Sequence, residues 1–478
     1  MRRIPAICSA GMATILMAAA GTPSARAQGV TGQKLSNTDR AQVEEMLSTI
    51  HDAVKKDYYD PTFHGVDMDA RYQKYKATLI GAPTLGEAFR VVAAYLSGLR
   101  DSRTFFVPPA ITSRFDYGFQ MQMIGDRSFV TEVRPGSDAA TRIHPGDEIL
   151  KLGSYSVGRK DFQDIEYYLN LLSPQDALEM LLRDPQGATR SELVRTKFIT
   201  GKRVVDTTSR DGGVGSWDLI LQREGMIHLV RQRCVEIGDA LIWKIPAFNM
   251  NPDEIDTMIA KANKHAALII DLRGDPGGLI DRLTYLTGSF FDREVTIATP
   301  IGRKHDKEVV AKPHGKTFTG RLFVLVDSRS ASASELFART MQLNHRGTVI
   351  GDSSAGAVME SKIHSFEAGA GSQSRVEIGS DIMVGGEVVA TTTLSPAPTG
   401  EDVLVHYAAS ITNDDLIMSD GKSLEGVGVT PDVIVLPTGA DLAVGRDPAL
   451  SKAAELAGAT LDPAAAGKLF PFEWAPLQ

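Results

Sequence analysis

The stretch RLFVLVDSRSASASELFARTMQL, residues 321–343, decides the fold class. Residues 321–326, all apolar after Arg321, predict a strand that is buried on both faces. Residues 331–343 predict a helix that follows this strand after a short serine-rich turn. A strand that leads directly into a helix is typical of α/β proteins with a largely parallel sheet.

The same alternation continues on the N-terminal side of this stretch. Residues 240–245 and 266–272 predict two further buried strands, and residues 252–263 predict a helix between them. We therefore expect an α/β core over residues 206–440, built on a mixed, mostly parallel sheet. Residues 441–478 form a tail that is rich in Ala, Pro and Gly and carries no readable chemistry.

Two other blocks precede the core. Residues 28–108 read as helical, because apolar residues recur at helical spacing from Val43 to Val54 after a capping stretch, and a second helix is predicted near 85–99. Residues 109–205 instead alternate short strands with Gly- and Pro-containing turns. The chain is thus expected to hold a helical region, a small β domain and an α/β core.

The β block resembles a PDZ domain. The resemblance rests on Tyr117-Gly118-Phe119, on the turn Arg134-Pro135-Gly136-Ser137 and on the stretch 145–150, in that order. It implies that Gly118 and Phe119 bind a peptide whose strand adds to a sheet edge. The alternative is a small β domain that only packs against the rest of the chain.

Composition and the first residues bear on location and partners. The 478 residues are 43% hydrophobic and carry a net charge of −8, so no excess of basic residues indicates binding to nucleic acid. Arg2 and Arg3, an apolar run and the small residues around Ala27 predict a signal peptide over 1–27, cleaved before Gln28. We expect a protein that is exported, to the periplasm or beyond, and not membrane-spanning. Cys234 is expected to be a packed thiol.

The serine-rich turn could carry nucleophilic chemistry. Ser332 stands at a strand-to-helix turn, where its hydroxyl can project from the sheet edge, and the N–H of Ala333 and the helix N-terminus can stabilise an oxyanion. The structural alternative is a capping box, since Glu335 follows Ser332 by three residues.

A second candidate lies in Asp271-Leu-Arg-Gly-Asp-Pro-Gly-Gly278, which follows a predicted buried strand. Ligands of open α/β sheets bind at the carboxyl ends of strands. Gly277 and Gly278 allow the backbone to approach a substrate closely and to donate an N–H. The alternative is a tight turn that simply needs glycine.

Together these segments resemble the tail-specific, or C-terminal processing, serine peptidases. The resemblance implies that Ser332 is the nucleophile, that Gly277 or Gly278 and Ala333 form the oxyanion hole, and that Glu425 supports a base. It also implies a polypeptide or C-terminal peptide substrate, and no metal or cofactor. The ordered segments that carry it are 58–61, 101–104, the PDZ-like block, 271–278, 330–335 and 426–432.

The sequence departs from that family at the general base. The position of the family's lysine holds Ala357, and the position of its histidine holds Arg103. Arginine cannot act as a base near neutral pH. Lys362, His364 or Asp352 could replace the base, or Arg103 could hold a carboxylate, whether Glu425 or a substrate group; alternatively, Arg103 is a solvated surface residue.

Two functions from different classes follow. The first is an exported serine peptidase that cleaves unfolded proteins or C-terminal peptides. The second is a catalytically impaired peptide-binding or adaptor protein on the same fold. A crotonase-like acyl transferase is disfavoured by the PDZ-like block and the serine cluster, and the sequence leaves the oligomeric state open.

Overall fold

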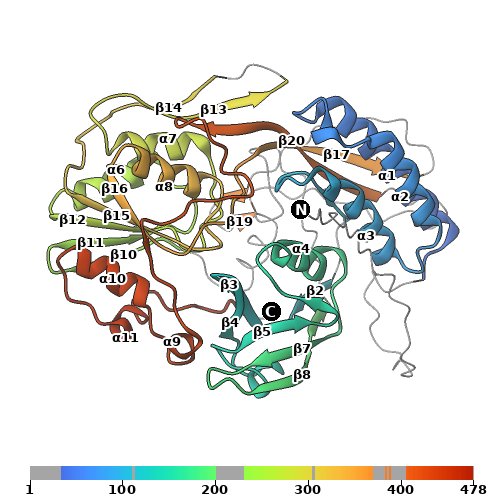
Figure 1. Cartoon of the computed structure of the whole chain (residues 1–478), viewed down its shortest axis with the longest axis horizontal. Helices are drawn as coiled ribbons and strands as arrows, with labels where there is room; N and C mark the ends of the chain where they lie inside the picture. The colour runs from blue at the N-terminus through green and yellow to red at the C-terminus, as the bar shows by residue number, and fades with distance from the viewer. Residues whose placement is uncertain are drawn as a thin grey trace, which may run out of the picture.

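The computed structural model describes residues 34–109, 113–200, 231–303, 307–369, 383–384, 387–388 and 405–476. Figure 1 shows three bodies: an α/β core, a helical layer over long strands, and a smaller β domain below them. The predicted signal peptide, residues 1–27, lies outside the described residues. Among the helices that are described, none is both long and apolar enough to cross a bilayer.

A six-stranded sheet forms the centre of the core. All neighbouring strands in it are parallel except the first pair, which is antiparallel. This confirms the predicted α/β class, and the predicted strand 321–326 matches its observed bounds. In spatial order the strands are β10 (Arg233–Ile237), β11 (Ala240–Lys244), β12 (Ala267–Asp271), β15 (Arg321–Val326), β16 (Gly347–Gly351) and β21 (Val433–Ile434).

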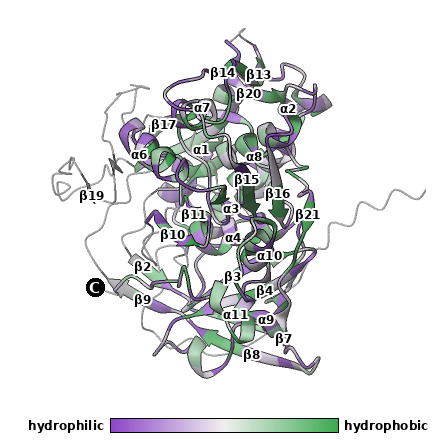
Figure 2. Cartoon of the chain, turned by 90° about the vertical axis from the view of Figure 1, so that its left-hand side faces the viewer, coloured by the Kyte–Doolittle hydropathy of each residue, from purple (hydrophilic) through white to green (hydrophobic). Residues whose placement is uncertain are grey.

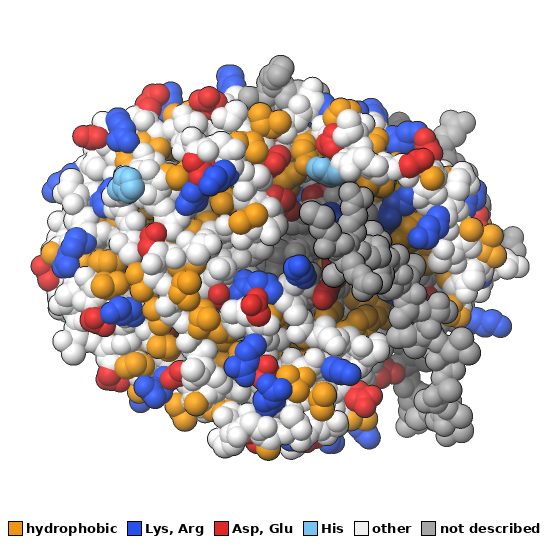
Figure 3. All heavy atoms as spheres, viewed as in Figure 1, with side chains coloured by type: hydrophobic (Ala, Val, Ile, Leu, Met, Phe, Trp, Pro, Cys, Tyr) orange, Lys and Arg blue, Asp and Glu red, His pale blue; other side chains and the backbone are white. Residues whose placement is uncertain are grey.

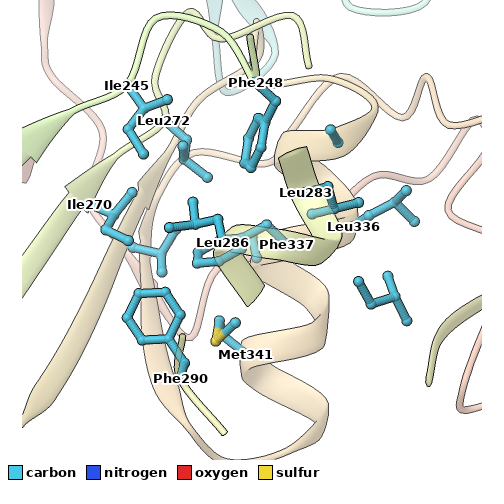
Figure 4. Packing of buried hydrophobic residues seen from close by; sticks show 14 of the residues in the cluster. Ile245, Phe248, Ile270, Leu272, Leu283, Leu286, Phe290, Leu336, Phe337 and Met341 are labelled. Atoms are coloured by element: carbon cyan, nitrogen blue, oxygen red, sulfur yellow. The ribbon is translucent and has the colours of Figure 1, made fainter. Parts of the chain in front are cut away.

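Helices cover both faces of this sheet. On one face α6 (Pro252–Ala262), α7 (Ile280–Gly288) and α8 (Ala333–Leu343) share a fully buried cluster with the strands. Figure 4 shows the rings of Phe248 and Phe337 in this cluster. On the other face α10 (Pro448–Leu456) and α11 (Pro463–Ala466) bury Ala and Leu side chains, so the C-terminal region contributes to the core. The short helix α9 (Gly439–Ala443) precedes α10.

The helical layer lies on a second, antiparallel sheet. The long strand β20 (Val405–Met418) pairs with β1 (Phe105–Val107), β13 (Val295–Gly302) and β17 (Glu360–Ala368), and β14 (Val309–Ala311) pairs with β13. Buried side chains of α1 (Asn37–Asp57) and α3 (Leu85–Leu96) meet these strands, which confirms both predicted helices.

One helix of this layer is absent from the sequence prediction. Helix α2 (Met68–Ile80) buries only Met68 and Leu79, so its apolar pattern is weak. Helix α1 is capped by Ser36, whose hydroxyl accepts from the N–H of Asp39 while the Asp39 carboxylate accepts from Ser36. The cap thus lies one residue before the stretch 37–39, in which the sequence predicts it.

The β domain is an antiparallel sheet with its own apolar cluster. The strand β3 lies at one edge, in the order β3-β4-β5-β7-β8. Its elements are β2 (Ser113–Asp116), β3 (Phe119–Ile124), β4 (Arg127–Val133), β5 (Glu148–Leu152), β6 (Tyr155–Ser156), α4 (Phe162–Tyr167), β7 (Ala177–Arg183), β8 (Thr189–Arg195) and β9 (Lys197–Thr200). Its cluster also takes in Ala331 and Ala357 from the core, so the β domain packs directly on the serine turn. The predicted domain boundaries stay predictions.

Hydropathy follows this layering. Figure 2 shows the most hydrophobic colour on the central strands β15 and β16 and mixed colour on the outer helices. The remaining described pair is β18 (Met383–Val384) with β19 (Glu387–Val388). On the face shown in Figure 3, basic and acidic side chains are interspersed, and the surface is hollowed near its middle.

Candidate active site

Ser332 lies in the turn between β15 and α8, in a backbone conformation that is rare for a residue with a side chain. Its φ is 55° and its ψ is −117°. Such strained residues cluster at functional sites, where the surrounding structure holds them in place. Its N–H donates to the carbonyl of Ala357 at 3.1 Å. The next N–H, that of Ala333, has no acceptor among the described residues and lies at the N-terminus of α8.

The glycine loop lies directly against this turn. A Cβ on Gly277 would be 2.7 Å from the Cβ of Ser332 and 2.9 Å from the nitrogen of Ala333, so only glycine allows this approach. The N–H of Gly277 already donates to the carboxylate of Asp275 at 2.7 Å. The N–H of Gly278, in contrast, has no acceptor within the part of the chain that is described.

Glu335 fastens a third segment to the turn. Its fully buried carboxylate accepts from the N–H groups of Ser332 at 3.0 Å, Ala357 at 2.9 Å and Gly356 at 2.7 Å, and from the hydroxyl of Ser354. Burial raises the pKa of Glu335, and these hydrogen bonds oppose the rise. The expected capping partner therefore has a larger role: it fixes the loop 354–357 beside Ser332.

The two positions that hold the base in the family are both buried here. Ala357 is 1% exposed and joins Ala331 in the apolar cluster of the β domain. Arg103 is 2% exposed, so the alternative that it is a solvated surface residue is wrong. Its loop is held by Asp101, whose carboxylate accepts from the N–H groups of Arg103 at 3.0 Å and Thr104 at 2.6 Å.

Glu425 comes close to the serine turn from a distant part of the chain. Its carboxylate accepts from the N–H of Ser102 at 2.6 Å, from the hydroxyl of Ser102 at 3.0 Å and from the N–H of Val358 at 3.0 Å. One peptide group, between Ala357 and Val358, therefore bonds to Ser332 through its C=O and to Glu425 through its N–H. Burial and the nearby charge of Asp101 raise the pKa of Glu425 to about 7.

Sequence reasoning missed Ser102 and Val358 as partners of this carboxylate. Ser102 is 323 positions from Glu425, and only the three-dimensional fold joins them. The resemblance of segment 101–104 to the family was the sequence feature that could have identified Ser102. It instead led to Arg103, the residue that follows Ser102.

The three alternative bases have other surroundings. Asp352 forms an ion pair with Arg159 at 2.6 Å. His364 lies on β17 with its ring 3.8 Å from the carboxylate of Asp57, and burial lowers its pKa. Lys362 is exposed on the same strand. Across the described ranges, no hydrogen bond joins any of these three to Ser332.

The predicted peptide-binding residues lie at the edge strand of the β domain. Phe119 begins β3, and the N–H of Gly118 donates to the carboxylate of Asp116 at 2.8 Å. The same edge contacts the serine turn. The hydroxyl of Ser328 donates to the carbonyl of Met123 at 2.6 Å, so β3 and the turn that holds Ser332 share a hydrogen-bonded contact.

The remaining candidates for reactive or metal-binding groups are Cys234 and clusters of His, Cys, Asp and Glu side chains. Cys234 is exposed on β10, so the expectation of a packed thiol is wrong. Its side chain points outward from an edge strand, where the amine of Lys261 lies 3.4 Å from its sulfur. The described residues contain no group of three or more His, Cys, Asp or Glu side chains arranged to hold a metal ion.

Comparison with known proteins agrees with this geometry. Residues 240–435 match the model of peptidase family S41, and residues 39–95 match that of the Tricorn protease C1 domain. The chain is similar in fold to mature CPAF complexed with lactacystin, with a TM-score of 0.55, 16% identity, and coverage of 85% of this chain and 95% of that one. A second structure, of mature CPAF, gives a TM-score of 0.54 at 15% identity, covering 85% of this chain and 94% of that one.

Two curated relatives carry peptidase names. A tail-specific protease of Haemophilus influenzae is 25% identical over 323 residues, which is 63% of this chain and 44% of that protein. A probable CtpA-like serine protease of Staphylococcus saprophyticus is 26% identical over 259 residues, 53% of this chain and 46% of that protein. The chain thus spans less than half the length of these relatives.

The α/β core with its strand-to-helix serine turn therefore matches the model of peptidase family S41 over residues 240–435. The chain resembles the tail-specific, C-terminal processing serine peptidases, which confirms the resemblance inferred from the sequence.

The role of Glu335 can be tested by substitution. Glu335→Ala leaves the buried N–H groups of Gly356 and Ala357 and the hydroxyl of Ser354 without this acceptor, and we expect it to lower the free energy of unfolding by about 3 kcal/mol or more. Denaturant unfolding measures this loss. Glu455→Ala, which removes an exposed carboxylate paired with Lys452, is the control and should change stability by less than about 1 kcal/mol. Equal losses in the two variants would contradict the assignment.

Proposed function

We propose that this protein is an exported serine peptidase that cleaves unfolded proteins or C-terminal peptides. The observation that carries the proposal is Ser332: a serine in a strained turn, beside a glycine loop and at the N-terminus of a helix. The peptidase names of the relatives, and the family S41 match, support the same chemistry. Export rests on the predicted signal peptide, and peptide recruitment rests on the PDZ-like resemblance of the β domain.

In the proposed reaction the hydroxyl oxygen of Ser332 attacks the scissile carbonyl carbon. Negative charge develops on the carbonyl oxygen, where the open N–H groups of Ala333 and Gly278 can donate to it. Gly277 contributes a close backbone approach and not a donor, because its N–H is bound to Asp275. The C–N bond then breaks and the amine leaves with the proton that was taken from the Ser332 hydroxyl. Water hydrolyses the acyl-enzyme, which releases the acid and restores the serine hydroxyl.

Glu425 is the group that we assign to proton removal. It lies one peptide group away from Ser332, so the proton would pass through a bound water. A carboxylate with a pKa of about 7 is matched to this task at neutral pH. Arg103 cannot take the proton, and a guanidinium in the position of the family's histidine should make the reaction slow.

The first test is degradation of casein by the purified mature chain. We expect slow cleavage that Ser332→Ala lowers by about 100-fold or more, because the nucleophile is lost. Ser97→Ala, at the exposed end of α3, is the matched control and should cleave at the rate of the unchanged protein. Cleavage that survives in Ser332→Ala would refute the nucleophile, and no cleavage by any form would support the impaired peptide-binding protein instead.

The pH profile tests Glu425. The ionised carboxylate is the form that accepts a proton, so kcat/KM should rise about tenfold per pH unit below about 7 and level off above it. Glu425→Gln should abolish this rise. A profile that keeps its inflection in Glu425→Gln would show that another group titrates.

Restoring the family's base tests the role of Arg103. Arg103→His places a side chain with an ordinary pKa near 6.5 at that position, and we expect casein cleavage to increase about tenfold or more. Arg90→His, an exposed substitution on α3, controls for a general effect of histidine. An unchanged rate in a folded Arg103→His variant would mean that this position does not face the nucleophile.

A further inference from the structure

The C-terminal segment, residues 471–476, ends against the β domain. The guanidinium of Arg134 donates to the carbonyl of Ala475 at 2.8 Å, and its central carbon lies 4.3 Å from the ring centroid of Trp474. A hydrogen bond and a cation–π contact thus converge from adjacent residues on one cation. Figure 1 shows the chain after α11 running to the domain that holds β3 and β4.

Arg134 belongs to the turn 134–137 and contacts Gly118, which was expected to bind a peptide. It is 7% exposed and forms an ion pair with Asp116 at 2.6 Å. Its N–H donates to the carbonyl of Gly118 at 2.8 Å, and Asp116 accepts from the N–H of Gly118 at 2.8 Å. The cation that binds the C-terminal segment is therefore fixed in a hydrogen-bonded network with both backbone polar groups of Gly118.

The segment is also held further upstream. The carboxylate of Glu473 forms ion pairs with Arg231 and, at 3.2 Å, with Arg233 beside the core sheet. Arg233 also donates to the carbonyl of Pro471 at 2.9 Å. The segment therefore has two sets of contacts. Glu473 binds arginines beside the core sheet, and Trp474 and Ala475 bind Arg134 of the β domain.

We propose that residues 471–476 are a tethered peptide ligand of the β domain, and that the site takes peptides of the acidic–aromatic–small type. The aromatic ring stacks on Arg134, the carbonyl of the following small residue accepts from the same guanidinium, and the preceding acid pairs with Arg231 and Arg233. The inference rests on the proposed peptide-binding role of this domain.

The tether has a thermodynamic consequence. A ligand joined to its site by a short stretch of chain acts at an effective concentration of about millimolar. A free peptide of the same type must compete with that concentration, so its apparent affinity for the full chain is reduced. Removing the segment removes the competition and leaves Arg134 with Asp116 in place.

The test is direct binding of a labelled peptide with the sequence PFEWAPLQ, residues 471–478. The proteins are the Ser332→Ala chain and the same chain ending at Phe470, so that cleavage plays no part. We expect fluorescence anisotropy to show binding at least about tenfold tighter for the shortened chain. Equal affinity for both chains, or no binding to a folded shortened chain, would overturn the proposal.

Substitutions separate the site from a general effect of shortening. In the shortened chain Arg134→Lys should weaken binding about tenfold, because lysine loses the planar stacking group, whereas the exposed Arg195→Lys should not. A peptide with alanine in place of tryptophan should bind about tenfold more weakly. If the shortened chain fails to fold, Trp474→Ala in the full chain replaces it and should raise the affinity for the labelled peptide.

The outcomes are independent of catalysis. Peptide binding that depends on Arg134, without casein cleavage by the unchanged chain, would support this inference and refute the peptidase. Casein cleavage that depends on Ser332, without binding of PFEWAPLQ to the shortened chain, would do the reverse.

Discussion

The buried carboxylate of Glu335 is the interaction on which the rest of the site depends. Removing a carboxylate from water is unfavourable unless hydrogen-bond donors replace the water. Here the N–H groups of Ser332, Gly356 and Ala357 and the hydroxyl of Ser354 do so. Because these donors come from two separate segments, satisfying one charge joins the serine turn to the loop beside it. The positive φ of Ser332 persists because both segments are held.

The other neighbours of the turn reinforce this arrangement. The carbonyl of Asp275 accepts from the N–H of Ala331 at 2.9 Å and from the hydroxyl of Ser334 at 3.2 Å, which ties the glycine loop to α8. The β domain adds the contact of Ser328 with Met123. Loops of the core and a strand of the β domain thus meet at the turn that holds Ser332, so a shift in any of them changes the environment of this serine.

The sequence predicts those parts that depend on local pattern. Apart from one charged residue at an end of each, the central strands β11, β12 and β15 are apolar because both faces of the sheet are covered, so the sequence alone predicts them. Helix α2 is not, because only two of its residues are buried. The approach of Glu425 to Ser102 depends on long-range packing, and no local spacing encodes it. The prediction of a packed Cys234 is wrong because local spacing does not show that its strand, β10, lies at the edge of the sheet, where the thiol is exposed.

The backbone arrangement around Ser332 and the group that accepts its proton depend on different interactions. The first can therefore form even where the second is poorly placed, and this affects the proposed chemistry. The strained serine, the glycine loop and the open N–H groups of Gly278 and Ala333 need no base to form, since packing and Glu335 hold them. In the proposed reaction, stabilisation of an oxyanion by these groups would give catalysis above the rate in water even when a proton acceptor is poorly placed. With Arg103 buried and Ala357 packed against the β domain, the proposed reaction assigns proton removal to Glu425, across a peptide group. A slow chemical step makes the residence time of the bound peptide decisive, so the rate should depend strongly on how peptides are held.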